Sequence, residues 1–326
     1  MWQSIINAVN PYFYIVTLRN LLYDLGVFKA KKVPVPVVSV GNLSCGGTGK
    51  TSVVRFLAEK LSQDVPLLIL SRGYRRRSKG FKWVLKEGRL LGDVYEAGDE
   101  PYLLARVFEG NPKLSVAVCE KRYEGALQAL KEVEPNLIIL DDGFQHRALY
   151  RDLDLVLIKR KDLSDRLLPF GRLREPKGSL KRAQALILAY QEVFPFEFSF
   201  ENKPVFKMYR KNFRLLNHEL KPFEPHNTIE FIAFSALGDN EQFFNTLEGL
   251  GIKLKGRLSF PDHWDYKGFT PKEDEFYLTT LKDFVKLRPL PNIFVLDFEV
   301  DVPGLEEFVK DVIFREACFL MRVIHS

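Results

Sequence analysis

VVSVGNLSCGGTGKTS, residues 37–52, is the stretch that decides the fold class. A β-branched run is followed by a glycine-rich turn and then by the start of a helix. Glycines let the backbone bend until successive N–H groups converge on one point, and a helix N-terminus adds positive charge there. This order of elements predicts a phosphate-binding loop between a buried strand and a helix.

The second half of this loop carries the chemistry. The Lys50 ammonium can reach the β- and γ-phosphates, and the Thr51 hydroxyl can ligate Mg²⁺. Ser44 stands where the usual spacing has a glycine, five residues before Gly49, so the motif is kept only in its functional half. The sequence thus predicts ATP and Mg²⁺ as cofactors. The predicted nucleotide-binding residues are Cys45, Gly46, Gly47, Thr48, Gly49, Lys50, Thr51 and Ser52.

A second acidic motif follows a buried run. Leu137–Leu140 ends in Asp141 and Asp142. In a parallel sheet the carboxyl end of this strand lies at the same edge as the loop, where such sheets bind ligands. We therefore expect these aspartates beside Mg²⁺. Which of the two ligates the ion directly is left open.

The rest of the chain follows an alternating pattern that predicts an α/β fold. Six short apolar runs suit strands covered on both faces, and stretches of helical spacing separate several of them. The runs are Val35–Val40, Leu67–Leu70, Leu114–Val118, Leu137–Leu140, Leu155–Ile158 and Leu186–Leu188. The predicted fold is a P-loop NTPase-like parallel sheet domain with a second, smaller α/β domain joined by a β linker. Its expected parts are an N-terminal segment (1–32), the P-loop domain (33–190), the linker region (191–229), the smaller domain (230–303) and a C-terminal helix returning to the P-loop domain (304–326).

Charge and cysteine content narrow the function classes. The net charge is +6, from 48 basic and 42 acidic residues, and basic residues concentrate in segments 72–82 and 159–182. These segments are either solvated loops or faces for an anionic partner. Three cysteines, far apart in the sequence, give neither a disulfide framework nor a zinc spacing, which fits a reducing compartment.

The N-terminal segment, residues 2–28, is apolar and rich in aromatic residues, but polar residues interrupt it. It lacks the pattern of a secretory signal and the length of about 20 apolar residues that a membrane span needs. Two interpretations remain from composition alone. The segment either packs on its own domain or lies in a membrane interface.

Two classes of protein other than a phosphate-transferring enzyme could use a loop of this kind. A P-loop GTPase switch would need an Asn-Lys-x-Asp element late in the sheet, and 159–162, Lys-Arg-Lys-Asp, occupies a comparable place without the Asn. A nucleic-acid-dependent ATPase would use the basic segments and would bind less tightly as salt rises.

Further runs give a specific resemblance that covers the whole chain in order. The runs are Gly41-Asn42, SRGY (71–74), AGDEP (97–101), DDGFQHR (141–147), LREP (173–176), FSALG (234–238), FPDH (260–263) and TTLKD (279–283). With these runs the sequence closely resembles the tetraacyldisaccharide 4′-kinase family of lipid A biosynthesis.

The resemblance implies an enzyme that phosphorylates the 4′-hydroxyl of a tetraacyldisaccharide 1-phosphate with ATP, giving lipid IVA. It implies a peripheral protein on the cytoplasmic face of the inner membrane, with its N-terminal helix on the membrane surface. The basic segments would then face the substrate 1-phosphate or anionic lipid head groups. No nucleic acid and no obligate protein partner are expected.

The resemblance also suggests roles for single residues. Asp99 would accept the hydroxyl proton, with His263 of the second domain as its partner and Lys50 as the third catalytic group. Glu100 joins Thr51 and the two aspartates as a candidate around Mg²⁺. The candidate substrate contacts are Tyr74, Arg122, Gln145, His146 and Arg174.

Overall fold

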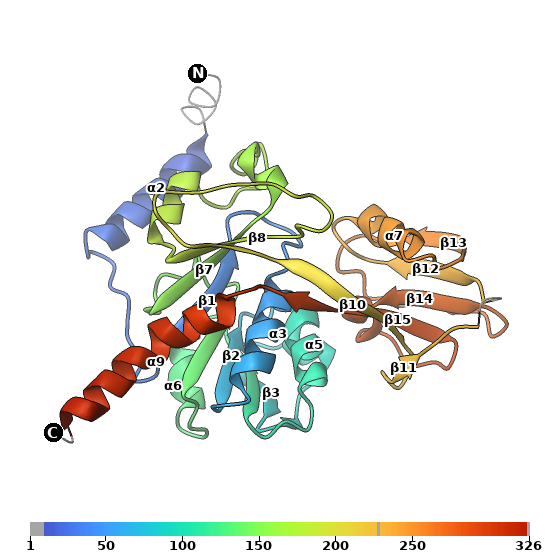
Figure 1. Ribbon diagram of the computed structural model, residues 1–326, viewed down its shortest axis with the longest axis horizontal. Helices are drawn as coiled ribbons and strands as arrows, with labels where there is room; N and C mark the ends of the chain where they lie inside the picture. The colour runs from blue at the N-terminus through green and yellow to red at the C-terminus, as the bar shows by residue number, and fades with distance from the viewer. Residues whose placement is uncertain (1–9, 227–228, 325–326) are drawn as a thin grey trace.

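The computed structural model describes residues 10–226 and 229–324. Two sheets, one in each of two domains, organise these residues (Figure 1). The large sheet has the order β4-β3-β5-β2-β6-β1-β7-β8-β9 and is parallel from β5 to β9. Its strands are β1 (Val37–Asn42), β2 (Leu67–Ser71), β3 (Lys82–Lys86), β4 (Arg89–Leu90), β5 (Leu114–Val118), β6 (Leu137–Asp141), β7 (Leu153–Ile158), β8 (Ala185–Leu188) and β9 (Val205–Lys207).

The expected α/β class is confirmed, and the six apolar runs predicted as strands of this sheet are β1, β2, β5, β6, β7 and β8. The antiparallel hairpin of β3 and β4 at the sheet edge was not predicted. Its strands are short and partly exposed, so they lack the continuous apolar run that marks the buried strands.

Helices cover both faces of the large sheet. α3 (Lys50–Leu61), α5 (Asp99–Val107) and α9 (Leu305–Ile324) pack on one face, where Leu155 and Leu157 of β7 point. α6 (Arg122–Ala129) packs on the opposite face of β2, β5 and β6. Also on that side, aromatic residues of α2 (Pro11–Asp24) pack against the apolar cluster that contains Val156 and Ile158 of β7. Successive side chains of β7 thus point to opposite faces of the sheet and enter two different cores.

α2 begins where the sequence has a cap and a proline. The Asn10 side chain accepts a hydrogen bond from the Tyr12 N–H at 3.0 Å, and Pro11 occupies the first turn. Residues 1–9 of the predicted membrane-interface segment lie outside the described residues. No helix among the described residues combines the length and the apolar character that crossing a membrane requires.

The smaller domain is built on a six-stranded sheet of order β11-β10-β15-β14-β12-β13. Segment 191–229 contributes β9 to the large sheet and β10 and β11 to this one. The antiparallel pair of β10 and β15 joins the two domains, and the chain returns along β15 into α9 (Figure 1). The elements are β10 (Tyr209–Leu216), β11 (Pro222–Phe223), β12 (Phe231–Ser235), α7 (Asn240–Gly249), β13 (Leu254–Ser259), β14 (Phe276–Thr280), α8 (Leu281–Phe284) and β15 (Ile293–Asp301).

Candidate active site

The glycine-rich loop connects β1 to α3, as the sequence predicts, and two of its glycines have left-handed backbone. Gly46 has φ +95° and Gly49, at the N-cap of α3, has φ +85°. A Cβ on Gly49 would lie 2.9 Å from the Tyr190 hydroxyl, so a larger residue has neither the conformation nor the space. Asn42 fixes the loop from below, since its amide donates to the Thr48 hydroxyl at 2.9 Å and to the Ser44 carbonyl at 2.7 Å.

A cavity of about 950 Å³ lies along this loop and between the two domains. The whole predicted nucleotide-binding stretch, 45–52, lines it. Glu100 of the large domain and Asp239 and Lys282 of the smaller one line it too. Lys159 and Lys161, from the second basic segment, stand on its wall. The volume suits a nucleotide, and the lining is rich in cations on the side of the loop.

Asp142 is held by cations. The Arg174 guanidinium donates to both of its carboxylate oxygens, at 2.8 and 2.7 Å, and the Lys50 Nζ lies 3.7 Å from Oδ1. Burial alone would raise the pKa of Asp142, but Lys50 and Arg174 outweigh it and hold the pKa well below its usual range. Asp142 is therefore an ionised side chain that orients Lys50 and Arg174.

Asp141 has the opposite environment. Its side chain is buried at the end of β6, and within the described residues neither carboxylate oxygen has a hydrogen-bond partner. Burial, together with the nearby Glu100, raises the pKa of Asp141 to about 8. A buried carboxylate without a partner costs free energy unless a cation or a proton satisfies it.

These oxygens fit Mg²⁺. Among the described residues no group of three or more His, Cys, Asp or Glu side chains is arranged to hold a metal ion alone. Mg²⁺ in phosphoryl-transfer sites is commonly held by one or two carboxylates together with substrate phosphates, so such a group is not needed. Asp141 pairs with Val40 of β1, the strand that leads into the loop carrying Thr51. An unpartnered carboxylate and a hydroxyl at this edge of the sheet are donors expected for this arrangement.

Asp99 and His263 meet across the domain interface. Asp99 begins α5, and His263 lies in the loop between β13 and β14 with φ +64°. Asp99 Oδ2 and His263 Nδ1 are 2.9 Å apart. Burial would raise the pKa of Asp99, but the His263 hydrogen bond and the charge of Lys286 outweigh it and lower this pKa. Since Asp99 is thus ionised and can only accept, Nδ1 of His263 carries the proton of this bond.

The predicted substrate contacts fall into two places. Tyr74 is more than half exposed, and its ring packs edge-on against His263 with centroids 5.5 Å apart. The other candidates contact residues of the large domain itself. Gln145 donates to the Asn42 carbonyl at 2.9 Å, and Arg122 is buried and donates to the Glu120 carbonyl.

Two of these residues have a pKa well below the usual value of their side chains. Burial lowers the pKa of Arg122 to about 10, and burial next to Arg122, Arg151 and Arg72 lowers the pKa of His146 to about 4. Several cationic side chains therefore stand close together around a neutral imidazole. Such a cluster suits an anionic group of a ligand.

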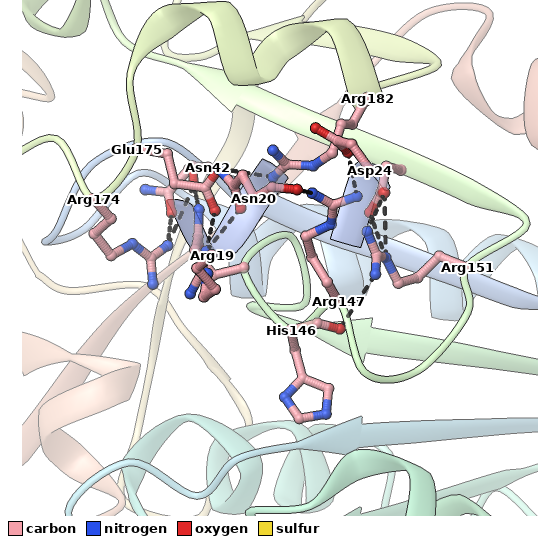
Figure 2. A network of polar contacts seen from close by, with 12 residues as sticks. Arg19, Asn20, Asp24, Asn42, His146, Arg147, Arg151, Arg174, Glu175 and Arg182 are labelled. Carbon is pink, nitrogen blue, oxygen red and sulfur yellow. Dashed lines mark hydrogen bonds and ion pairs between the residues drawn. The ribbon is translucent and has the colours of Figure 1, made fainter. Parts of the chain in front are cut away.

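Glu175 belongs to the LREP run (173–176), but no role was predicted for it from the sequence. Its carboxylate is fully buried and binds Arg19 and Asn20 of α2, at 2.9 and 3.0 Å, and Arg182 at 2.8 Å (Figure 2). Its neighbour Arg174 makes the fork on Asp142. Two consecutive residues thus contact the N-terminal helix and the phosphate-loop site. An acidic residue inside the basic segment 159–182 was the available signal.

The family model and the curated relatives that match this chain carry the same activity name. Residues 7–314 match the family model described as tetraacyldisaccharide-1-P 4′-kinase. The chain is 54% identical over 315 residues to a tetraacyldisaccharide 4′-kinase of Aquifex aeolicus, covering 95% of this chain and 98% of that protein. It is 36% identical over 306 residues to one of Chlorobaculum tepidum, covering 88% and 87%.

A solved structure agrees with the sequence relatives. The crystal structure of LpxK from Aquifex aeolicus, described as an "apo" form in complex with ATP, matches with a TM-score of 0.85 at 52% identity, covering 97% of this chain and 99% of that one. The predicted resemblance and the P-loop-like fold are confirmed. The chain therefore belongs to the tetraacyldisaccharide-1-P 4′-kinase family.

Proposed function

We propose that this protein transfers the γ-phosphate of ATP to the 4′-hydroxyl of a tetraacyldisaccharide 1-phosphate, giving lipid IVA. The relatives carry the name of this activity, and one of them is described with ATP. The observation that carries the proposal is the Asp99–His263 pair. It stands beside the cavity that the phosphate loop lines, because Glu100 and Asp262, next to the pair in sequence, line the same cavity.

The phosphate loop supplies the nucleotide half of the reaction. Backbone N–H groups of 46–49 and the start of α3 bind the phosphates, and Lys50 neutralises charge on the β- and γ-phosphates. Thr51 and Asp141 are the proposed Mg²⁺ ligands, with Glu100 and Asp142 beside them. When bound, Mg²⁺ would screen the negative charge that gathers on the transferred phosphoryl group.

Asp99 is the proposed acceptor of the hydroxyl proton. Phosphoryl transfer is chiefly a matter of position and charge, so the base has to be held in place more than it has to be strong. His263 fixes Asp99 through Nδ1. Because the two residues come from different domains, the pair exists only when the domains approach as they do here, which would couple transfer to closure.

The acceptor side is assigned to the cluster on the large domain and to Tyr74. Arg122, with Arg72 close enough to affect its pKa, would bind the 1-phosphate, and Gln145 and His146 would contact the sugar. A neutral His146 offers one donor and one acceptor, which suits hydroxyl groups. Tyr74, exposed beside His263, would contact the acceptor sugar next to Asp99.

The acyl chains of the proposed substrate suggest a role for α2 at a membrane surface. Its outward side carries large apolar residues that are 48–67% exposed, while its inner side is tied to Glu175. We propose peripheral contact with the cytoplasmic face of the inner membrane, without an obligate protein partner. The exposed apolar residues of this helix and its C-cap are Tyr14, Ile15, Leu18, Leu21 and Leu25.

A transfer assay tests the proposal. Purified protein, ATP, Mg²⁺ and tetraacyldisaccharide 1-phosphate in detergent should give a lipid with one more phosphate. The same assay with GTP, and with DNA or RNA added, separates the kinase from a GTPase switch and from a nucleic-acid-dependent ATPase. Folded protein that hydrolyses ATP but leaves the lipid unphosphorylated would refute the assignment.

A further inference from the structure

Lys286 is a buried lysine of the smaller domain, two residues after the end of α8. Its side chain is only 5% exposed. Its Nζ lies 2.8 Å from Asp283 Oδ1, donates to the Trp264 carbonyl at 3.0 Å, and lies 3.7 Å from Asp99 Oδ2 in the other domain. It also lies 5.1 Å from the centre of the Tyr266 ring. The ammonium thus has acidic groups of both domains around it.

The position of this ammonium is well defined by its surroundings. Asp283 is fully buried, and its Oδ2 accepts hydrogen bonds from the Ala236 N–H at 3.0 Å and the Thr280 hydroxyl at 2.9 Å. These hydrogen bonds hold the Asp283 carboxylate in one position, so it also restricts the position of the Lys286 ammonium. The Trp264 carbonyl belongs to the residue next to His263, so Lys286 also fixes the backbone that carries His263.

Lys286 and His263 approach the same atom. Within the part of the chain that the structure describes, Asp99 contacts the other domain through Oδ2, which lies 2.9 Å from His263 Nδ1 and 3.7 Å from Lys286 Nζ. Oδ1 is then the oxygen left for a ligand. A carboxylate held at one oxygen by two cationic or donor groups loses the rotation that would otherwise exchange its oxygens.

We propose that Lys286 is a positioning residue of the transfer reaction, which together with His263 fixes Oδ2 of Asp99 and so directs Oδ1 toward the acceptor hydroxyl. The inference rests on the role proposed for Asp99. A purely structural Lys286 would only neutralise Asp283. The two roles differ in what happens to turnover when the fold is kept.

The first variant is Lys286→Met, which keeps the length of the side chain and removes its charge. We expect kcat to fall about 10- to 30-fold, as for a lost contact to a charged group, with KM for ATP unchanged within about twofold. Lys267→Met is the control, because Lys267 is 64% exposed in the same loop as His263 and pairs with its near neighbour Asp265. A kcat equal to that of the control would overturn the proposal.

A second variant guards against misfolding, since Lys286→Met leaves Asp283 buried and unpaired. Lys286→Met/Asp283→Asn removes both charges, and the Asn oxygen can still accept from Ala236 and Thr280. We expect its melting temperature to lie nearer to wild type than that of Lys286→Met, with the low kcat kept. Recovery of kcat along with stability would show a structural role and refute the inference.

A double-mutant cycle decides whether Lys286 acts through Asp99. In the Asp99→Asn background, Lys286→Met should lower the remaining kcat by less than about twofold, because the group it positions is gone. An equal loss in both backgrounds would overturn the inference. If Asp99→Asn itself has wild-type turnover, the role proposed for Asp99 fails first, which is a different outcome from failure of Lys286 alone.

Discussion

The phosphate loop and the Asp99 cluster are built in opposite ways. The loop comes from consecutive residues, 45–52, between one strand and one helix of the large domain. The cluster joins Asp99 of α5 to His263 and Lys286 of the other domain, and Asp99 and His263 are 164 residues apart. One domain therefore supplies the loop that binds the phosphates, whereas the proposed proton acceptor is complete only between two domains. Variants of the two regions should separate binding from transfer.

The largest effect is expected from Asp99→Asn, which keeps the shape and removes the base. Turnover should fall about 10³- to 10⁴-fold, the upper part of the range for a lost acid–base group. The dissociation constant of ATP, measured by titration, should change less than about threefold. Loss of ATP binding instead would place Asp99 in the Mg²⁺ site and would remove the contrast between the regions.

Lys50→Met tests the other region. Lys50 would contact phosphates both before and during transfer, so kcat/KM should fall about 10³-fold. Unlike Asp99→Asn, this variant should also bind ATP more weakly. Titration of both proteins with ATP under the same conditions measures the difference. Equal ATP affinities for the two variants would contradict the comparison.

Glu175→Ala tests how much the attachment of α2 to the large domain contributes to stability. It leaves Arg19 and Arg182 without their buried partner, and breaking such a pair costs about 3 kcal/mol of unfolding free energy. Denaturant unfolding measures this loss. Glu219→Ala is the control, because its pair with Lys221 is exposed to solvent and should contribute little to stability. Equal losses would show that α2 is attached by other contacts.

Arg174→Lys makes a smaller change in the same region. Lysine keeps the charge but cannot make the two parallel bonds to Asp142. We expect kcat/KM to fall about tenfold. Arg257→Lys in the smaller domain, where the arginine pairs with exposed glutamates, should leave the rate unchanged and serves as the control.

The smallest effect concerns pH. His146 has a folded pKa of about 4, below the usual histidine pKa of about 6.5, so its neutral form is favoured in the folded protein. The unfolded chain then binds the proton more readily, and stability present above pH 6.5 is lost as the pH falls toward 4. His146→Gln should lose less stability over this interval, as measured by urea unfolding at several pH values. Identical curves would show that other groups set the acid sensitivity.

The same contrast explains what the sequence could predict. The loop, the two aspartates and the buried parallel strands each depend on neighbouring residues, so local patterns were sufficient. Asp99 and His263 were identified by resemblance alone, because no spacing rule relates residues in different domains.

Other contacts could not be predicted at all. Lys286 and Asp283 form an i,i+3 pair that looks like ordinary surface charge, and only the fold buries it against Asp99. Glu175 lies in a basic stretch, but nothing in the sequence shows that two of its partners come from α2. Such partners are chosen by tertiary packing, which a single sequence does not reveal.

The ion pairs of Glu175 have a consequence for orientation. They fix the roll angle of α2, a helix of 14 residues and therefore about 21 Å long, relative to the large sheet. Under the proposed membrane contact, the direction that the whole molecule presents to the lipid is set inside the protein. The distance between the catalytic cavity and the lipid head groups is then set by the way α2 docks on the large sheet.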